Sequence, residues 1–324
     1  MARIEKRGNR WRARVRSGGV DLSESFATKA DARAWAAKVE ADATAGKLGQ
    51  AVDRTFAQMV RRYIDDVLPA KRGERPERLR LEKLIRDDDL GGVRLPALGA
   101  EHVAAWRDRR LKQVSAASVL REWATLSAVC TVAVKEWRWL PVNPFSTVKK
   151  PPEPAPRTRT IAATELDAIL HCCGYTPTGS LETAQARVGA AVVFALETAM
   201  RASEICGLEP ARIDRRRRVA YLPMTKNGTA RDVPLSSRAL AVLDQVGDRF
   251  GLTPAILDAL WRKARDRAQI QDLHFHDLRA SALTRMAKIF NPLELAKISG
   301  HKDLNLLSNT YYREDVATFA ARLD

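Results

Sequence analysis

A proline-rich, basic stretch is the feature that most limits what this 324-residue chain can fold into. Residues 141–156 hold six prolines, together with the pair Lys149 and Lys150. Proline lacks the backbone N–H that helices and central strands need, so the stretch favours an extended, semi-rigid connection. We therefore predict a linker at 146–156 with separately folded parts on either side, and the chain length suits two or three domains.

The charge balance indicates a polyanionic partner. The formal net charge is +16 at pH 7 and the pI is about 10.1. Basic residues outnumber acidic ones in 1–50, 51–150 and 151–324 alike. Such a spread suits a protein that encloses DNA, because each phosphate contact releases counterions. Solubility is the plainer explanation, but solubility does not require so high a pI.

Residues 1–50 predict a small domain with a sheet and a helix. Arginines alternate with Trp11, Ala13 and Val15, which is the period of a strand with one basic face. A turn at Gly18–Gly19, a second strand at 22–26 and a helix at 29–44 follow. An arginine-faced ribbon can enter a DNA major groove, although a solvated strand face explains the pattern equally well. The arginines are Arg10, Arg12, Arg14 and Arg16.

Residues 51–145 predict an all-helical domain, with helices at 56–67, from about 76, at 101–112 and at 115–137. Three consecutive carboxylates, Asp87 to Asp89, precede Leu90 and two glycines. We interpret them as a solvated loop, because no second carboxylate cluster supports a two-metal site. Lys149 and Lys150 in the linker after this domain are candidates for completing a clamp around a duplex.

Residues 157–324 predict a mainly helical domain with one β-hairpin. Thr164 is the expected cap of the first helix, and a nearly continuous apolar helix at 184–200 suits the centre of a core. Strands at 219–222 and 231–233 flank Asn227–Gly228, a strong hairpin signal. The other helices are expected at 202–207, 237–246, 254–268, 276–289, 292–299 and 304–312. The fold class is mainly α with small β elements.

Composition also bears on compartment. Cys130, Cys172, Cys173 and Cys206 show no metal-ligand spacing, and we expect reduced, mostly buried thiols. The N-terminus lacks the apolar region of a secretory signal. No apolar run reaches the roughly 18 residues that a membrane span needs. These features predict a soluble, cytoplasmic protein associated with the nucleoid.

Basic residues and tyrosines in the last third of the chain form the candidate site. Arg201 has apolar neighbours, so its guanidinium is expected to be partly buried and to meet an anion, with Glu204 one helical turn away to orient it. A plain surface ion pair is the alternative. Lys226 stands at the hairpin tip, where it is either simply solvated or able to act as a general acid in DNA.

The remaining candidates follow in chain order. His276 and Arg279 are three residues apart and are expected on one helix face. His301 comes after Gly300, where we expect a helix to start and an anion to be favoured. Tyr311 and Tyr312 end a short helix, and a tyrosine can act as a covalent nucleophile or simply pack.

Taken in order, these residues resemble the tyrosine recombinases of the phage-integrase type. That family's pattern is Arg, Lys, His-x-x-Arg, His or Trp, then Tyr. The resemblance is specific in 157–324 and looser in 55–145, which is similar to the family's core-binding domain. Residues 1–50 are similar to its small arm-binding domain, a three-stranded sheet on a helix, of which the sequence shows two strands. The expected division is 1–50 arm-binding, 51–145 core-binding, 146–156 linker and 157–324 catalytic.

The resemblance leaves the nucleophile open between two tyrosines. In many relatives it lies nine residues after the second histidine, and that position is Thr310 here. Tyr311 requires a smaller insertion than Tyr312 and is favoured, with Tyr312 as the alternative. In some members of the family a neighbouring protomer supplies the tyrosine.

The resemblance also implies a reaction. Tyrosine attacks a phosphate to form a 3′-phosphotyrosyl link, with Arg201, Arg279 and His301 stabilising the non-bridging oxygens. Lys226 protonates the leaving oxygen, and His276 buttresses the phosphate or assists proton transfer. No metal, ATP or other cofactor is expected.

The implied partners are double-stranded DNA attachment sites and a homo-tetramer on paired sites. A host DNA-bending protein and a directionality factor are further candidates. An apolar stripe at 316–323 is expected to dock on a neighbouring subunit or on its own. The alternatives within the same chemistry are a dimer resolvase, an invertase and a type IB topoisomerase. A non-catalytic DNA-binding protein that keeps the fold is the alternative of another class.

Overall fold

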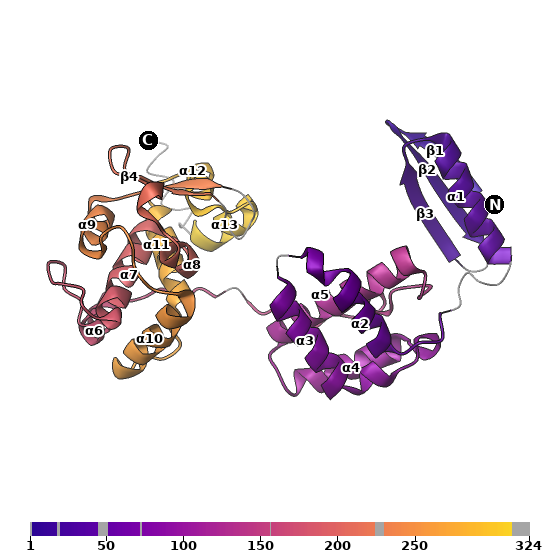
Figure 1. Ribbon diagram of the computed structural model, residues 1–324, viewed down its shortest axis with the longest axis horizontal. Helices are drawn as coiled ribbons and strands as arrows, with labels where there is room; N and C mark the ends of the chain where they lie inside the picture. The colour runs from indigo at the N-terminus through magenta and orange to yellow at the C-terminus, as the bar shows by residue number, and fades with distance from the viewer. Residues whose placement is uncertain are drawn as a thin grey trace, which may run out of the picture. The chain divides into compact units, whose positions relative to one another are not determined.

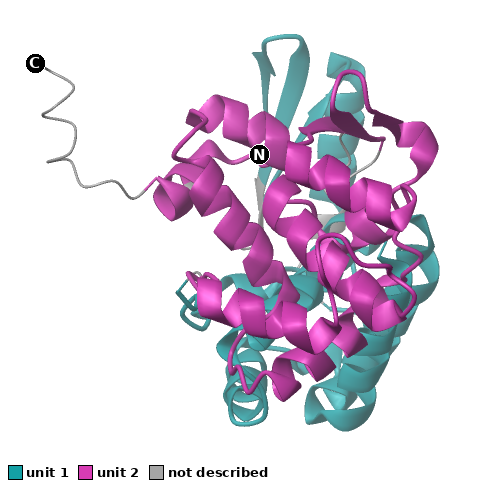
Figure 2. Ribbon diagram, turned by 90° about the vertical axis from the view of Figure 1, so that its left-hand side faces the viewer, with its two compact units in different colours: residues 1–155 teal, residues 156–324 magenta. Residues whose placement is uncertain are grey.

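The computed structural model describes residues 2–17, 20–44, 51–71, 73–155, 157–223 and 230–312 (Figure 1). The chain forms two compact units, residues 1–155 and residues 156–324 (Figure 2). Unit 1 contains two separate hydrophobic cores, one in its N-terminal sheet and helix and one in its helical part. The expected fold class, mainly helical with small antiparallel sheets, is confirmed.

The N-terminal part is an antiparallel sheet in the order β1-β2-β3 with one helix packed on it. The elements are β1 Ala2–Arg7, β2 Arg10–Ser17, β3 Val20–Phe26 and α1 Lys29–Thr44. The expected alternation is confirmed, because Ala13 and Val15 are buried whereas Arg10 and Arg14 are exposed. Strand β1 was not predicted from the sequence, because Ile4 is the one large apolar residue in it. The Gly18–Gly19 turn lies outside the described residues.

The helical part of unit 1 packs around aromatic rings. Trp106, Trp123 and Phe145 form a cluster with ring centroids 5.1 to 6.0 Å apart. The helices are α2 Phe56–Asp66, α3 Glu74–Asp87, α4 Ala100–Leu111 and α5 Ala116–Val132, continued by the π-helical turn η4 Ala133–Trp137. Short 3₁₀ turns connect them: η1 Leu68–Ala70, η2 Asp89–Gly92, η3 Leu95–Ala97 and η5 Pro144–Ser146.

Two expectations for this part need correction. Phe145 belongs to the core, and the Asn143 side chain donates to the Ser127 carbonyl at 2.9 Å. The first residues of the proline-rich stretch therefore pack on the helices and are not an extended spacer. Asp88, expected in a solvated loop, is largely enclosed and accepts a hydrogen bond from Arg109 at 2.6 Å.

One helix among the described residues, Ala116–Trp137, is long and apolar enough for a membrane span by length and composition alone, with a mean hydropathy of 1.2. The helix is not an uninterrupted apolar run, because Arg121, Glu122, Lys135 and Glu136 lie within it. The apolar residues serve a core instead: Trp123 and Leu126 are buried, and Glu122 on the same helix pairs with Arg110 at 2.7 Å. It is a core helix of unit 1.

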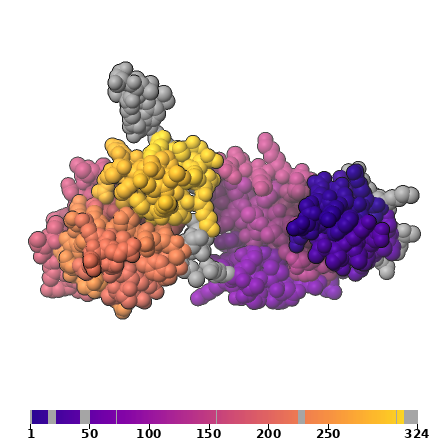
Figure 3. Space-filling model, turned by 90° about the horizontal axis from the view of Figure 1, so that it is seen from above, coloured from indigo at the N-terminus to yellow at the C-terminus, as the bar shows by residue number. Residues whose placement is uncertain are grey.

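Unit 2 is built around α7 Ala184–Thr198, whose residues from Val188 to Ala195 are all buried. The helices α6 Ala163–Cys173, α9 Ser237–Val246, α10 Pro254–Arg267 and α11 Phe275–Met286 pack on it. In the space-filling view the yellow C-terminal elements pack directly on the orange middle of the unit (Figure 3). The remaining elements are α8 Ala202–Cys206, η6 Pro210–Arg212, β4 Ile213–Asp214, β5 Val219–Leu222, β6 Arg231–Pro234, α12 Pro292–Ser299 and α13 Leu304–Tyr311.

Unit 2 departs from expectation at two points. Thr164 is not the cap of α6: the helix starts at Ala163, and the Glu165 carboxylate accepts the Ala162 N–H at 2.9 Å. The hairpin gains a short third strand, β4, paired with β5. The hairpin tip with Asn227–Gly228 and the C-terminal residues 313–324 lie outside the described residues.

Candidate active site

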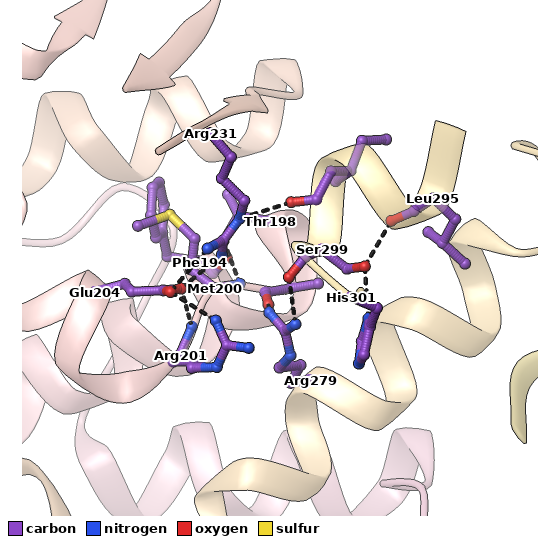
Figure 4. A network of polar contacts seen from close by, with 12 residues as sticks. Phe194, Thr198, Met200, Arg201, Glu204, Arg231, Arg279, Leu295, Ser299 and His301 are labelled. Atoms are coloured by element: carbon purple, nitrogen blue, oxygen red, sulfur yellow. Dashed lines mark hydrogen bonds and ion pairs between the residues drawn. The ribbon is translucent and has the colours of Figure 1, made fainter. Parts of the chain in front are cut away.

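Five elements of unit 2 carry the candidate residues, and Figure 4 shows the residues that four of these elements place close together. Arg201 precedes α8, Glu204 lies in α8, and Arg279 lies in α11. His301 follows α12, and Tyr311 ends α13. The strand β6 adds a residue that the sequence did not single out, Arg231.

Glu204 holds two arginines in place. Its carboxylate accepts from Arg201 Nη1 at 2.8 Å and from the Arg201 backbone N–H at 2.8 Å. It also accepts two hydrogen bonds from Arg231, at 2.9 and 2.7 Å. Burial raises the pKa of Glu204, but the hydrogen bonds from Arg231 and from the Arg201 backbone outweigh it and lower the pKa to about 2. Glu204 is therefore a fixed negative charge that orients Arg201, and the ion pair is not a plain surface pair.

Arg231 is buried, and its Nε donates to the Ile298 carbonyl at the end of α12 at 2.9 Å. Its inward position follows from strand periodicity, since Arg231 and Val233 are buried while Asp232 and Pro234 are exposed. A charged residue in phase with the buried residues of a strand was the signal available in the sequence.

Arg279 is the most deeply buried cation of the site, with 3% of its surface exposed. It donates to the Ala199 carbonyl and, at 2.6 Å, to the Ser299 carbonyl. Ala199 ends α7 in the left-handed conformation, with φ of 53°. Desolvation and the nearby charges of Arg201 and Arg231 lower the pKa of Arg279 to about 10, so it stays cationic at neutral pH.

His276 lies three residues before Arg279 in α11 but is exposed where Arg279 is buried. The charges of both act on His301, so the two residues share one side of the site. The first turn of α11 is anchored by Asp277, which accepts two hydrogen bonds from Arg157, each at 2.9 Å. The beginning of unit 2 thereby holds the helix that carries both residues.

His301 is half-buried between α12 and α13. The expected helix start at this position is wrong: Gly300 caps the C-terminus of α12, and α13 begins three residues later, at Leu304. The Ser299 hydroxyl lies 2.7 Å from His301 Nδ1. Desolvation, followed by the charges of Arg279, Arg201, Arg231 and His276, lowers the pKa of His301 to about 4.

The two tyrosines differ in what they face. The Tyr311 ring lies 6.2 Å from the His301 ring, centroid to centroid. Burial raises the pKa of the Tyr311 phenol, and the charge of Arg279 opposes that rise. The Tyr312 hydroxyl instead donates to the Phe290 carbonyl at 2.6 Å. Tyr311 therefore faces the cationic cluster, whereas the Tyr312 hydroxyl is engaged elsewhere.

The other predicted residues lie in unit 1 or outside the described residues. Lys226 lies outside the described residues. Arg10, Arg12 and Arg14 lie on β2 in unit 1, and the side chain of Arg16 is not described. Lys149 and Lys150 are exposed in the linker. Within the described part of the chain no group of three or more His, Cys, Asp or Glu could hold a metal ion.

The arrangement is suited to a single oxyanion. Arg201, Arg279, His276 and His301 supply positive or polar groups, Arg231 is bonded to Glu204, and the Tyr311 phenol lies beside His301. Buried cations of one sign are costly unless an anion joins them. A phosphodiester is an anion of the required size and charge, and a phenol beside it is a group that can act as a covalent nucleophile.

Comparisons with known proteins agree with this chemistry. Residues 159–317 match the model of the phage integrase family. A Haemophilus influenzae protein named as a candidate integrase/recombinase is 40% identical over 330 residues, covering 98% of this chain and 88% of that protein. The shufflon-specific DNA recombinase of Escherichia coli is 33% identical over 270 residues, covering 78% of this chain and 67% of that protein.

Solved structures share the fold. A lambda integrase dimer bound to a COC′ core site matches with a TM-score of 0.66 at 16% identity, over 97% of this chain and 95% of that chain. The Tn1549 transposon integrase, in complex with circular intermediate DNA, matches with a TM-score of 0.66 at 19% identity, over 83% and 99% of the two chains.

Proposed function

Because the chain belongs to the phage integrase family and is a tyrosine recombinase, an enzyme of site-specific DNA recombination, we propose that its unit 2 cuts and rejoins DNA with Tyr311 as the nucleophile. Arg201, Arg279 and His301 bind the non-bridging oxygens of the scissile phosphate. Glu204 and Arg231 hold Arg201 in position.

The steps balance without an outside energy source. The Tyr311 oxygen forms a bond to phosphorus, the bond from phosphorus to the 5′ oxygen breaks, and Lys226 gives its proton to that oxygen. The phenol proton passes to His276 or to solvent as the bond to phosphorus forms, and in the second case His276 buttresses the phosphate. The 3′-phosphotyrosyl link conserves the energy of the broken linkage, and a 5′-hydroxyl from a partner duplex reverses the chemistry to complete strand exchange.

One observation carries the choice of nucleophile. Tyr311 lies beside His301 and senses the charge of Arg279, whereas the Tyr312 hydroxyl donates to a backbone carbonyl. An attacking oxygen must lie near the cations that stabilise the charge it creates. Tyr311 meets this requirement within one subunit.

The biological role that we propose is integration and excision of phage or mobile-element DNA at attachment sites, by a tetramer on paired sites. The arginine-bearing sheet of β1, β2 and β3 supports it, since a second DNA-binding module suits additional arm sites. The lambda integrase tetramer on a Holliday junction, similar in fold, supports the assembly. A host DNA-bending protein and a directionality factor would assist.

A DNA invertase is the second candidate. The similarity to the shufflon-specific recombinase favours it, and the site chemistry is the same for both. The position of Tyr311 beside His301 does not favour a non-catalytic DNA-binding protein, because binding alone does not need a phenol there.

Covalent trapping tests the proposal. Nicked suicide duplexes that tile the DNA flanking the gene are incubated with the full-length protein in the presence of a chelator. We expect a covalent protein–DNA adduct with the wild type and with Tyr312→Phe, and none with Tyr311→Phe. Adducts with both variants would contradict a single nucleophile, and no adduct with the wild type would favour a binder or a metal-dependent nuclease.

A further inference from the structure

The hydroxyl of Ser299, next to the candidate active site, has two hydrogen-bond partners. Its side chain is completely buried at the end of α12. The hydroxyl oxygen lies 2.6 Å from the Leu295 carbonyl oxygen and 2.7 Å from His301 Nδ1 (Figure 4). Neither the sequence pattern nor the family motif pointed to this residue.

The number of protons on each group determines which one donates in the two hydrogen bonds of the Ser299 hydroxyl. A carbonyl oxygen only accepts, and a hydroxyl has one proton to give. The Ser299 proton therefore goes to Leu295, and the Ser299 oxygen accepts from His301. The imidazole must then bear its proton on Nδ1, which leaves a lone pair on Nε2 while the ring is neutral.

We propose that Ser299 is a positioning residue that fixes the proton of His301 on Nδ1, so that the proton taken up when the scissile phosphate binds must enter at Nε2. This inference rests on the proposed function, because it assigns the state in which His301 meets the phosphate. Without DNA the Nε2 atom of His301 is an acceptor. With the phosphate in place it becomes a charged donor.

The surroundings of His301 support such a change. Three arginines and a histidine face it: Arg279 and His276 on α11, Arg231 on β6, and Arg201 before α8. The phenol of Tyr311 faces it from α13, and the negative charge of Glu204 lies between Arg201 and Arg231. Burial and these cations keep the pKa of His301 near 4, so the ring is neutral in the free protein. A phosphate anion bound among the same groups raises the pKa of His301, because its negative charge favours the imidazolium.

The backbone of Ser299 serves a separate purpose. Its carbonyl accepts from Arg279 at 2.6 Å, and this contact does not involve the hydroxyl. A Ser299→Ala change therefore removes the control of His301 while the Arg279 contact stays. Ser281→Ala is a matched control: that hydroxyl also bonds back to a carbonyl four residues earlier, Asp277 at 2.9 Å, and its other partner is the Ile161 N–H.

Nitrogen-15 NMR of histidine-labelled full-length protein tests the tautomer directly. In the DNA-free wild type at pH 7 we expect the His301 signal of a ring protonated at Nδ1 and bare at Nε2. Ser299→Ala should give a mixture of tautomers, and Ser281→Ala the wild-type signal. A wild-type ring protonated at Nε2 would overturn the proposal, as would a Ser299→Ala spectrum identical to that of the wild type. The wild-type measurement requires no variant to fold.

The rate of covalent trapping on the nicked duplexes gives a second readout. The wild-type rate should fall as pH rises through the pKa of His301 in the DNA complex, because the donor proton is then lost. Ser299→Ala should be about tenfold slower, the effect of losing one orienting hydrogen bond, and its pH profile should shift. An unchanged rate and profile would contradict the inference. If the wild type forms no adduct, the proposed function fails, while the NMR result still decides the role of Ser299.

Discussion

Replacing Glu204 with glutamine should destabilise unit 2 in a pH-dependent way. The carboxylate is shared by Arg201 and Arg231, whose side chains are 17% and 5% exposed. A fall in pKa from 4.5 to about 2 corresponds to about 3 kcal/mol at ~1.36 kcal/mol per unit. Glutamine keeps part of the hydrogen bonding, so we expect a loss of about 2 kcal/mol at neutral pH.

The sign of the pH dependence follows from linkage. The pKa of Glu204 is lower in the folded than in the unfolded state, so its contribution is fully present above pH 4.5 and is lost as pH falls toward 2. The difference in unfolding free energy between wild type and Glu204→Gln should be constant from pH 7 to about 5 and should shrink below that.

The assay needs a probe confined to unit 2, and Trp261 is the only tryptophan after residue 139. Urea unfolding followed through the fluorine-19 signal of Trp261, in protein labelled with fluorotryptophan, isolates this unit. The control is Glu209→Gln, which removes an exposed i,i+3 pair with Arg212 at 3.5 Å and should change stability by about 0.5 kcal/mol or less. Equal losses in the two variants, or a Glu204→Gln loss that does not shrink in acid, would refute the reasoning.

Three further predictions concern the same cluster. Arg231→Lys should slow covalent trapping about tenfold or more, because an ammonium cannot make the paired contact with Glu204; a wild-type trapping rate would contradict a positioning role. Arg279→Lys should raise the barrier by about 3 kcal/mol while electrophoretic mobility shifts still show DNA binding, and single-turnover rates measure it. Gly300→Ala should lower the stability of unit 2 by about 1 kcal/mol or more in the same fluorine-19 assay. The reason is that the φ angle of Gly300 is +72° and an added Cβ would lie 3.2 Å from the Arg231 Cδ. Unchanged stability would contradict this strain.

Periodicity and end signals predicted most of the helices. The apolar stretch at 184–200 became the central helix α7, and the alternation around Ala13 and Val15 became β2. Such patterns record local burial, which a sequence shows directly. The ends were harder, because a glycine between two helical patterns can belong to the end of one helix or precede the start of the next. Gly300 looked like the residue before a helix but caps the one that precedes it.

The sequence predicted the residues proposed to contact the phosphate but not the residues that position them. Arg201, Arg279 and His301 were chosen from the sequence as a set that meets at one phosphate, and the structure brings them together with Tyr311. Arg231 was missed because it acts through Glu204, which is distant in the sequence. Ser299 was missed because a serine two residues before a histidine is no signal until the folded geometry places its hydroxyl against Nδ1. The pairing of Arg231 with Glu204 is visible only once β6 and α8 are folded together.

Mass spectrometry of the trapped adduct tests the central claim most directly. The covalent complex is digested with protease and nuclease, and the peptide that carries the nucleotide remnant is sequenced by fragmentation. A phosphotyrosyl bond at Tyr311 is the predicted result. A remnant on Tyr312, or on any other side chain, would contradict the account.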